Sequence, residues 1–251
     1  LIRVAIAKGY CEKYGIKCEL QMIPTSPLGI QAMMAKSIDS AMAPTAATNL
    51  AVQKGTKMKA VAGGQVNNIA LIAFGNTMES PNAGKPWPLF MQDLKGKKLG
   101  VPARGSTLEI YAAWLLEKAG MNPEKDVTFV ATGAVPTSFG ALASKQVDAV
   151  ISYDPLGAIC DIAKACKVQW RADTDKQPAE MYAINGGSVN QVFTQEYIDK
   201  NPHVIDAVIK TVKDADAFMN NPVNFAETLA ISQKYFKLDM PKGEEILAAN
   251  L

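Results

Sequence analysis

The sequence contains a single histidine, His203, among its 251 residues, and it has no long hydrophobic run. Its apolar stretches reach about ten residues, whereas a membrane-spanning helix needs about 20. Neither sign of charge dominates, because 26 Lys and Arg residues are balanced by 24 Asp and Glu residues, for a formal net charge of +2. This balance argues against a dedicated nucleic-acid-binding protein, which usually carries a basic excess. One histidine also gives little support to acid–base catalysis.

Cysteine is scarce as well, and its four residues form two close pairs in the sequence, Cys11 with Cys18 and Cys160 with Cys166. Metal sites usually combine a C-x2-C spacing with histidine, and His203 lies far from both pairs. Two short-range disulfides in an oxidising compartment therefore fit the spacing better. Four unrelated buried thiols are the alternative, since cysteine is often buried as a small hydrophobic residue.

Strand-like and helix-like segments alternate as far as about residue 190. We expect strands at 16–23, 38–43, 57–62, 68–74, 97–101, 127–131, 148–152 and 168–171, and helices at 28–36, 45–54, 106–119, 137–145 and 155–165. Such repeated units predict mainly parallel sheets covered by helices. A Pro-, Gly- and Asn-rich stretch at 75–88 looks like a domain boundary, and the chain after residue 194 reads as helical only. The pattern therefore predicts two lobes, residues 1–75 plus 186–251 and residues 76–185.

Four segments occur in the order found in one known protein family. Ala7–Ile16 is similar to the pattern A-K-x-x-G-Y-F-x-x-x-G-L, and Asp93–Val101 to D-L-K-G-K-K-V-G-V. Gly105–Thr107 matches G-S-T at a helix start, and Ala141–Ala149 is similar to A-L-x-x-G-x-V-D-A. Over nearly its whole length the chain resembles the nitrate/sulfonate/taurine group of periplasmic solute-binding proteins, which includes binders of thiamine precursors.

The resemblance implies a two-lobed α/β fold of the periplasmic-binding-protein type II, each lobe a mainly parallel sheet flanked by helices. It implies an ABC-importer solute-binding protein that captures a small anionic ligand, such as a sulfonate, nitrate, carboxylate or aromatic acid, by hinge closure. An uncharged pyrimidine also stays open. The hinges are expected near Phe74–Gly75 and Ala183–Gly187. An enzyme of the same fold, acting on a small heterocyclic or menaquinone-pathway metabolite, is the alternative.

The same resemblance predicts the setting of the protein. We expect no catalytic activity, no cofactor and no metal, a monomer, and delivery of the ligand to a membrane permease and its ATPase. The expected location is the periplasm, or a lipid-anchored extracytoplasmic position. The chain begins inside what reads as a helix, so we expect a trimmed or processed form in which the family's first strand and its loop precede Leu1.

The resemblance also bears on the cysteines. Cys11 stands where the family usually has an aromatic residue and Cys18 where an aliphatic one is usual, and these positions pack together in the family. This implies a Cys11–Cys18 bridge. Residues six apart on one helix face different ways, so a Cys160–Cys166 bridge requires the helix to end before Cys166.

Ligands of open α/β sheets bind beyond the carboxyl ends of the strands, where helix N-termini present free N–H groups. The predicted ligand-binding residues at such corners are Ser26, Thr45, Arg104, Gly105, Ser106, Thr107, Thr132, Tyr153 and Asp154. The Arg104–Thr107 corner is the strongest candidate, because it combines hydroxyls, free N–H groups and a permanent charge. Helix capping is the alternative for the Ser, Thr and Asp residues, a surface position for Arg104, and a core position for Tyr153.

Overall fold

The computed structural model describes residues 1–23, 25–65, 70–182, 189–235, 238 and 240–249. The chain forms two compact units. Described residues up to 65 and from 189 onward belong to the first unit, and residues 70–182 belong to the second. Within the described ranges, no helix is long and apolar enough to cross a membrane.

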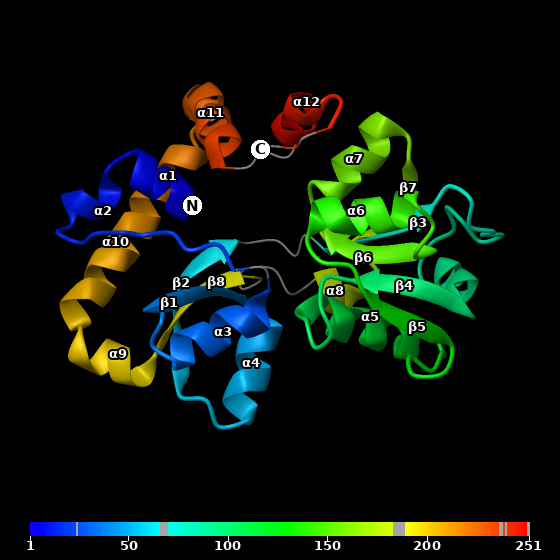
Figure 1. The fold of residues 1–251 in the computed structure, drawn as a ribbon, viewed down its shortest axis with the longest axis horizontal. Helices are drawn as coiled ribbons and strands as arrows, with labels where there is room; N and C mark the ends of the chain where they lie inside the picture. The colour runs from blue at the N-terminus through cyan, green and yellow to red at the C-terminus, as the bar shows by residue number, and fades with distance from the viewer. Residues whose placement is uncertain (24, 66–69, 183–188, 236–237, 239, 250–251) are drawn as a thin grey trace. The chain divides into compact units, whose positions relative to one another are not determined.

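The first unit is built on a three-stranded sheet in the order β1-β8-β2, with β8 antiparallel to both neighbours. The strands are β1 (Ser40–Pro44), β8 (Val189–Thr194) and β2 (Met58–Gln65). Two helices, α3 (Ser26–Met34) and α4 (Thr45–Gln53), pack against β1, as Figure 1 shows. Apolar side chains of both helices and all three strands, Met33 and Val192 among them, form one core cluster.

Further helices complete the first unit. These are α1 (Ile2–Ala7), α2 (Tyr10–Lys13), α9 (Gln195–Lys200), α10 (Pro202–Met219), α11 (Phe225–Tyr235) and α12 (Gly243–Ala248), with the 3₁₀ turn η2 (Pro222–Asn224). Four of them, α1, α2, α10 and α11, contribute to a second apolar cluster. The long helix α10 packs against β2, α1 and α2, and buries Ala215 against Val4 and Cys11. His203, on the first turn of α10, is exposed.

The second unit contains a five-stranded sheet in the order β5-β4-β6-β3-β7. Its strands are β3 (Ala70–Gly75), β4 (Lys97–Val101), β5 (Val127–Ala131), β6 (Ala149–Tyr153) and β7 (Cys166–Arg171). The three strands β5, β4 and β6 are parallel, whereas β3 runs antiparallel to both β6 and β7.

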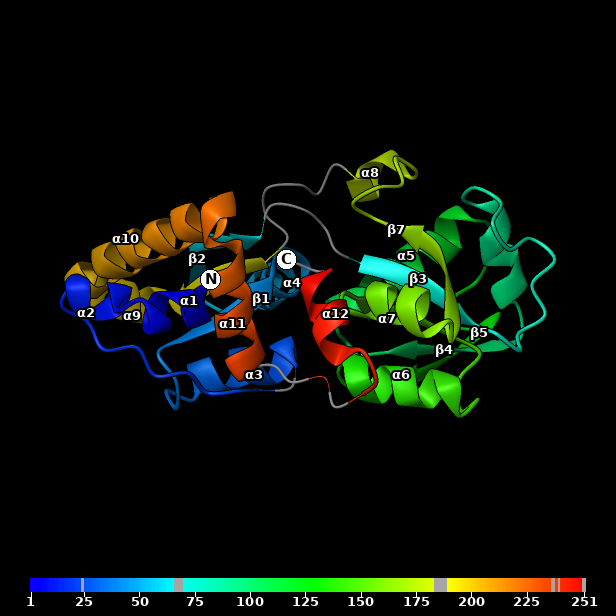
Figure 2. The same ribbon diagram turned by 90° about the horizontal axis from the view of Figure 1, so that it is seen from above.

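Helices cover both faces of this second sheet. They are α5 (Thr107–Lys118), α6 (Val135–Ala143) and α7 (Leu156–Ala163), with the 3₁₀ helix η1 (Leu89–Leu94), and the short helix α8 (Ala179–Tyr182) follows β7. The crossover from β4 to β5 and the crossover from β5 to β6 run in opposite directions, so a common handedness places α5 and α6 on opposite faces (Figure 2). The buried rings of Phe74 and Phe90 meet edge to face at 6.2 Å.

The prediction of mainly parallel sheets is wrong. Among the described residues, the strand pairs of the first sheet are all antiparallel, and the second sheet is mixed. The reason is that β8 returns from the end of the second unit and lies between β1 and β2, while β3 enters the second sheet directly after β2. The predicted strand at 16–23 is also wrong over its described residues, because this segment joins no ladder there. Its Lys17 and Glu19 form an exposed ion pair.

The expected lobe boundary at residue 75 is displaced. Residues 70–75 were expected in the first lobe, but β3 pairs with β6 and β7 in the second. The stretch 75–88 is no linker, since Asn76 Nδ2 donates to the Lys164 carbonyl at 2.8 Å and the Gly84 N–H donates to Gln169 Oε1 at 2.9 Å. The first predicted hinge therefore lies within a sheet strand, and the second, Ala183–Gly187, lies outside the described residues.

Both cysteine pairs are disulfides in the structure. Cys11 of α2 is joined to Cys18 in the segment that follows, and Cys11 is fully buried. Helix α7 ends at Ala163, and Lys164 turns the chain in the left-handed conformation, so that Cys166 opens β7 and reaches back to Cys160. The helix thus ends before Cys166, as the pairing requires.

Candidate functional site

One edge of the second sheet collects most of the predicted ligand residues. The parallel strands β4, β5 and β6 end at this edge with Val101, Ala131 and Tyr153, and Val101 pairs directly with Ala131. Seven of the nine predicted residues lie at or just after these strand ends: Arg104, Gly105, Ser106, Thr107, Thr132, Tyr153 and Asp154. The other two, Ser26 and Thr45, belong to the first unit.

The corner after β4 starts helix α5. Gly105 has a φ of +73°, a left-handed conformation that side chains disfavour, and this turn aims the chain into the helix. Ser106 is the N-cap, and its Oγ accepts a hydrogen bond from the Glu109 N–H at 3.4 Å. The Ser106 N–H itself donates to the Ala103 carbonyl at 3.1 Å. Ser106 therefore caps α5, which is the alternative to ligand binding that the sequence allowed for this residue.

Glu109 is the residue at this corner that the sequence analysis missed. Its carboxylate accepts the Gly105 N–H and forms an ion pair with Arg104 at 3.0 Å. Arg104 also donates to the Phe129 carbonyl at 3.3 Å and lies over the Phe129 ring. The Arg104 charge is thus paired within the protein. The signal was present in the sequence, because Ser106-Thr107-Leu108-Glu109 has the S-x-x-E form of a capping box.

Three hydrogen-bond donors remain at the start of α5. The first N–H groups of an α-helix have no partner inside the helix, and among described residues none accepts from the N–H of Thr107 or Leu108. Thr107 is only 6% exposed, and its Oγ1 is buried without a hydrogen-bond partner in the part of the chain that is described. A buried hydroxyl in this state costs roughly 1–3 kcal/mol, so a partner there is expected.

Thr132, at the end of β5, is fully engaged within the protein. Its N–H and Oγ1 both lie close to the Val101 carbonyl, at 2.8 and 3.1 Å, and Oγ1 lies 2.9 Å from Ser138 Oγ. Ser138 of α6 is completely buried. These bonds join the ends of β4 and β5 to α6, which is a structural role for Thr132.

Tyr153 is the last residue of β6, and Asp154 follows it. Tyr153 is half-buried, and burial raises the pKa of its phenol above the ordinary value, so the phenol stays a neutral donor. Asp154 Oδ1 accepts the Gly157 N–H at 3.0 Å and Oδ2 pairs with Arg171 Nη1 at 2.9 Å. Pro155 is the N-cap of α7, so Asp154 lies one residue before the cap and holds an N–H of the first turn with Oδ1; both its carboxylate oxygens have partners.

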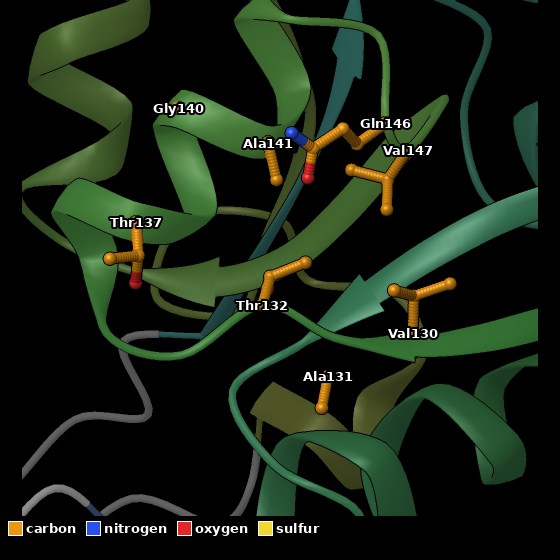
Figure 3. A pocket seen from close by; sticks show the side chains of 8 residues that line it. All are labelled: Val130, Ala131, Thr132, Thr137, Gly140, Ala141, Gln146 and Val147. Atoms are coloured by element: carbon orange, nitrogen blue, oxygen red, sulfur yellow. The ribbon is translucent and has the colours of Figure 1, made fainter.

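A cavity of about 400 Å³ lies in the second unit between β5 and α6 (Figure 3). Its lining residues are Val130, Ala131, Thr132, Thr137, Gly140, Ala141, Gln146 and Val147. Figure 3 shows Val130 and Ala131 on the strand and Thr137 on the helix, with Thr132 between them. Thr132 is the one predicted ligand residue in this lining.

Two predicted residues lie at helix starts of the first unit. Ser26 is the first residue of α3 and is half-buried. Thr45 is the first residue of α4, and its Oγ1 accepts a hydrogen bond from Asn190 Nδ2 of β8 at 2.8 Å. The antiparallel pairing of β1 and β8 brings Asn190 to this corner. Within the described residues, no group of three or more His, Cys, Asp or Glu side chains forms a metal-binding arrangement.

Comparison with known protein families gives one match over most of the chain. The sequence model of the NMT1-like family matches residues 2–232. A protein of Brucella abortus (strain 2308), whose name describes it as a binding protein, is 28% identical over 237 residues. The alignment covers 94% of this chain and 67% of that relative. A relative in Brucella suis biovar 1 (strain 1330) gives the same values.

Three solved structures illustrate the fold that this chain shares with known proteins. A Bordetella bronchiseptica RB50 protein has a TM-score of 0.80 at 22% identity, covering 99% of this chain and 74% of its own. The periplasmic aliphatic sulphonate-binding protein SsuA of Escherichia coli has a TM-score of 0.73 at 20% identity, and the alignment covers 99% of this chain and 77% of SsuA. The periplasmic nitrate-binding protein NrtA of Synechocystis PCC 6803 has a TM-score of 0.73 at 17% identity, and the alignment covers 92% of this chain and 62% of NrtA. The chain therefore has the periplasmic-binding-protein fold.

Proposed function

The chain belongs to the NMT1-like family, and from this membership we propose that it is the solute-binding protein of an ABC importer. Its proposed ligand is a small anion, such as a sulfonate, nitrate, a carboxylate or an aromatic acid. Its relatives in Brucella are named binding proteins, and the two periplasmic proteins of the same fold bind an aliphatic sulphonate and nitrate. These names support a binding role in preference to an enzymatic one.

The observation that carries the proposal is the buried hydroxyl of Thr107. It lies at the N-terminus of α5, a helix of 12 residues, beside N–H groups that have no acceptor among the described residues. A helix N-terminus carries the equivalent of about half a positive charge, and N–H groups there bind oxyanions. An oxygen of the ligand would accept hydrogen bonds from Thr107 Oγ1 and from the N–H groups of Thr107 and Leu108.

The remaining parts of the proposed site are Ser106 and Gly105, which shape the corner, and Tyr153, whose half-buried ring would form an aromatic wall. Thr132 and Asp154 would support the site through their internal hydrogen bonds instead of contacting the ligand. Arg104 would act on the ligand only through its pairing with Glu109. For Ser26 and Thr45 we keep the proposal of ligand contact, with the Asn190 bond holding the Thr45 hydroxyl in place.

We further propose that the two units act as lobes whose arrangement changes when the ligand binds, and that a membrane permease with its ATPase receives the ligand. The periplasm, or a lipid-anchored position outside the cytoplasm, is the proposed location, and a monomer the proposed state. Small-angle scattering with and without ligand tests the change of arrangement. An unchanged radius of gyration at saturation contradicts it.

A thermal-shift panel of small sulfonates, nitrate, carboxylates and aromatic acids tests the binding function. At least one compound is expected to raise the melting temperature, because a ligand that binds only the folded state stabilises it. Calorimetry of Thr107→Val with that compound should show a ten- to hundredfold loss of affinity, or about 1.5–3 kcal/mol for one hydrogen bond to a charged group. The matched control is Thr128→Val, at an exposed position of β5. Equal affinities of both variants contradict the proposed site.

A further inference from the structure

Helix α5 carries its own anion at its N-terminus. Glu109 accepts the Gly105 N–H with one carboxylate oxygen, and the other lies 3.0 Å from Arg104 Nη2. The Glu109 side chain is only 14% exposed, whereas that of Arg104 is 62% exposed. The buried charge at this corner is therefore the negative one, and the cation that balances it lies mostly in water.

The donors left for a ligand are uncharged. They are the Thr107 hydroxyl, buried and without a partner in the described chain, and the N–H groups of Thr107 and Leu108. The helix dipole supplies about half a positive charge at such a place, and hydrogen bonds to a charged acceptor add to it, so a singly charged group is the one that these donors compensate best. Arg104, the cation that the described residues place at this corner, is already paired with Glu109, so it is not free to compensate a second negative charge on the ligand.

Coulomb repulsion from Glu109 grows in proportion to the charge of the ligand, and the cost of removing an ion from water grows faster still. A doubly charged oxyanion is therefore disfavoured on both counts relative to a singly charged one of similar size. We propose that Glu109 restricts the α5 corner to singly charged or uncharged ligand groups and excludes doubly charged anions such as sulfate. This inference rests on the proposed function, since it concerns the ligand group at the same corner.

The substitution Glu109→Gln separates charge from geometry. The glutamine side-chain oxygen can still accept the Gly105 N–H, while the negative charge disappears and Arg104 becomes an unpaired cation. At low ionic strength, the affinity for sulfate is expected to rise about tenfold and that for nitrate about threefold. The effect on sulfate is larger because the same change in potential acts on two charges. Isothermal calorimetry with sodium sulfate and sodium nitrate measures both.

Glu117→Gln is the matched control. Glu117 is an exposed residue of the same helix, eight positions further on and thus about 12 Å along the axis. The control removes the same charge from the whole protein but should leave both affinities within twofold of the parent. An equal gain in both variants, or no gain for sulfate in Glu109→Gln, overturns the proposal.

Arg104→Ala gives an independent test, in which both affinities should fall instead of rise. It can replace Glu109→Gln if that variant does not fold. It leaves the Glu109 carboxylate unpaired, so nitrate affinity is expected to fall about threefold and sulfate affinity about tenfold. Equal or higher sulfate affinity overturns the proposal. The proposed function fails on a different result, namely a panel in which no compound stabilises the parent protein, because a sulfate gain in Glu109→Gln does not depend on the natural ligand.

Discussion

Arg171 Nη1 lies 2.9 Å from Asp154 Oδ2, and this half-buried ion pair joins the end of β7 to the start of α7. The guanidinium lies directly over Gly157, where an added Cβ would come within 1.8 Å of Arg171 Nη2. Asp154 also accepts the Gly157 N–H. Gly157, Arg171 and Asp154 thus depend on one another. Replacing a helical glycine by alanine normally stabilises a protein, but at Gly157 the opposite is expected.

Gly157→Ala is expected to destabilise the protein by about 1 kcal/mol, because the methyl group displaces the guanidinium from Asp154. The control is Gly140→Ala in α6, where an added Cβ meets nothing within 4 Å. There the ordinary gain of about 0.5–1 kcal/mol from replacing glycine in a helix should appear. Urea unfolding of both variants measures the two free energies. Stabilisation by both substitutions would contradict the close packing over Gly157.

Thr132→Val is expected to destabilise the protein by roughly 1–3 kcal/mol, because it keeps the shape of the side chain but leaves the buried Ser138 hydroxyl without its partner. The exposed Thr128 of the same strand provides the control, since Thr128→Val should change stability by about 0.5 kcal/mol or less. Chemical denaturation gives both values. If Thr132→Val instead loses ligand affinity while its stability is unchanged, Thr132 contacts the ligand.

Protein prepared under oxidising conditions should contain no free thiol after denaturation, because both cysteine pairs are bridged. Removing the first bridge by Cys11→Ala with Cys18→Ala should lower the free energy of unfolding by about 2.5 kcal/mol in the chain-entropy model for an eight-residue loop. Reduced parent protein serves as the control and should lose at least as much stability. Four free thiols in the oxidised, denatured protein would contradict both bridges.

Glu196 should make stability depend on pH in the acid range. Hydrogen bonds from Lys200 and Lys36, with their charges, lower the pKa of Glu196 to about 2. A carboxyl whose pKa is lower in the folded state contributes stability above its unfolded pKa, near 4.5, and loses it as pH falls toward 2. The melting temperature of Glu196→Gln should therefore lie below that of the parent at pH 6 and converge with it near pH 2.

The same comparison at high salt provides a check, because all three side chains are at least half exposed. Salt screens exposed charges, so the difference between Glu196→Gln and the parent at pH 6 should shrink in 1 M NaCl. Glu117→Gln, which removes an exposed glutamate with no described ion pair, should show neither dependence. A difference that persists at pH 2 would mean that the substitution acts through something other than charge.

Sequence patterns determined the kind and place of many elements. The strands predicted at 97–101 and 127–131 have those bounds in the structure, and the helix predicted from Ser106 begins at Thr107 with Ser106 as its cap. These features depend on neighbours within a few residues, such as alternating apolar side chains and a hydroxyl before a helix. The cysteine spacing likewise favoured the two bridges, because each closes only a short loop.

Tertiary structure decided what joins residues far apart in the chain. Strand β8 lies between β1 and β2, although more than 120 residues separate it from β2, and β3 belongs to the second sheet. The pairing of Arg171 with Asp154 and of Thr45 with Asn190 likewise depends on where the strands end in space. At α5 the sequence supplied the donors and even the S-x-x-E pattern, but only the folded corner shows the Glu109 carboxylate pairing with Arg104. Local propensity sets which conformation a segment adopts, whereas its partner is chosen by the packing and charge compensation of the whole unit.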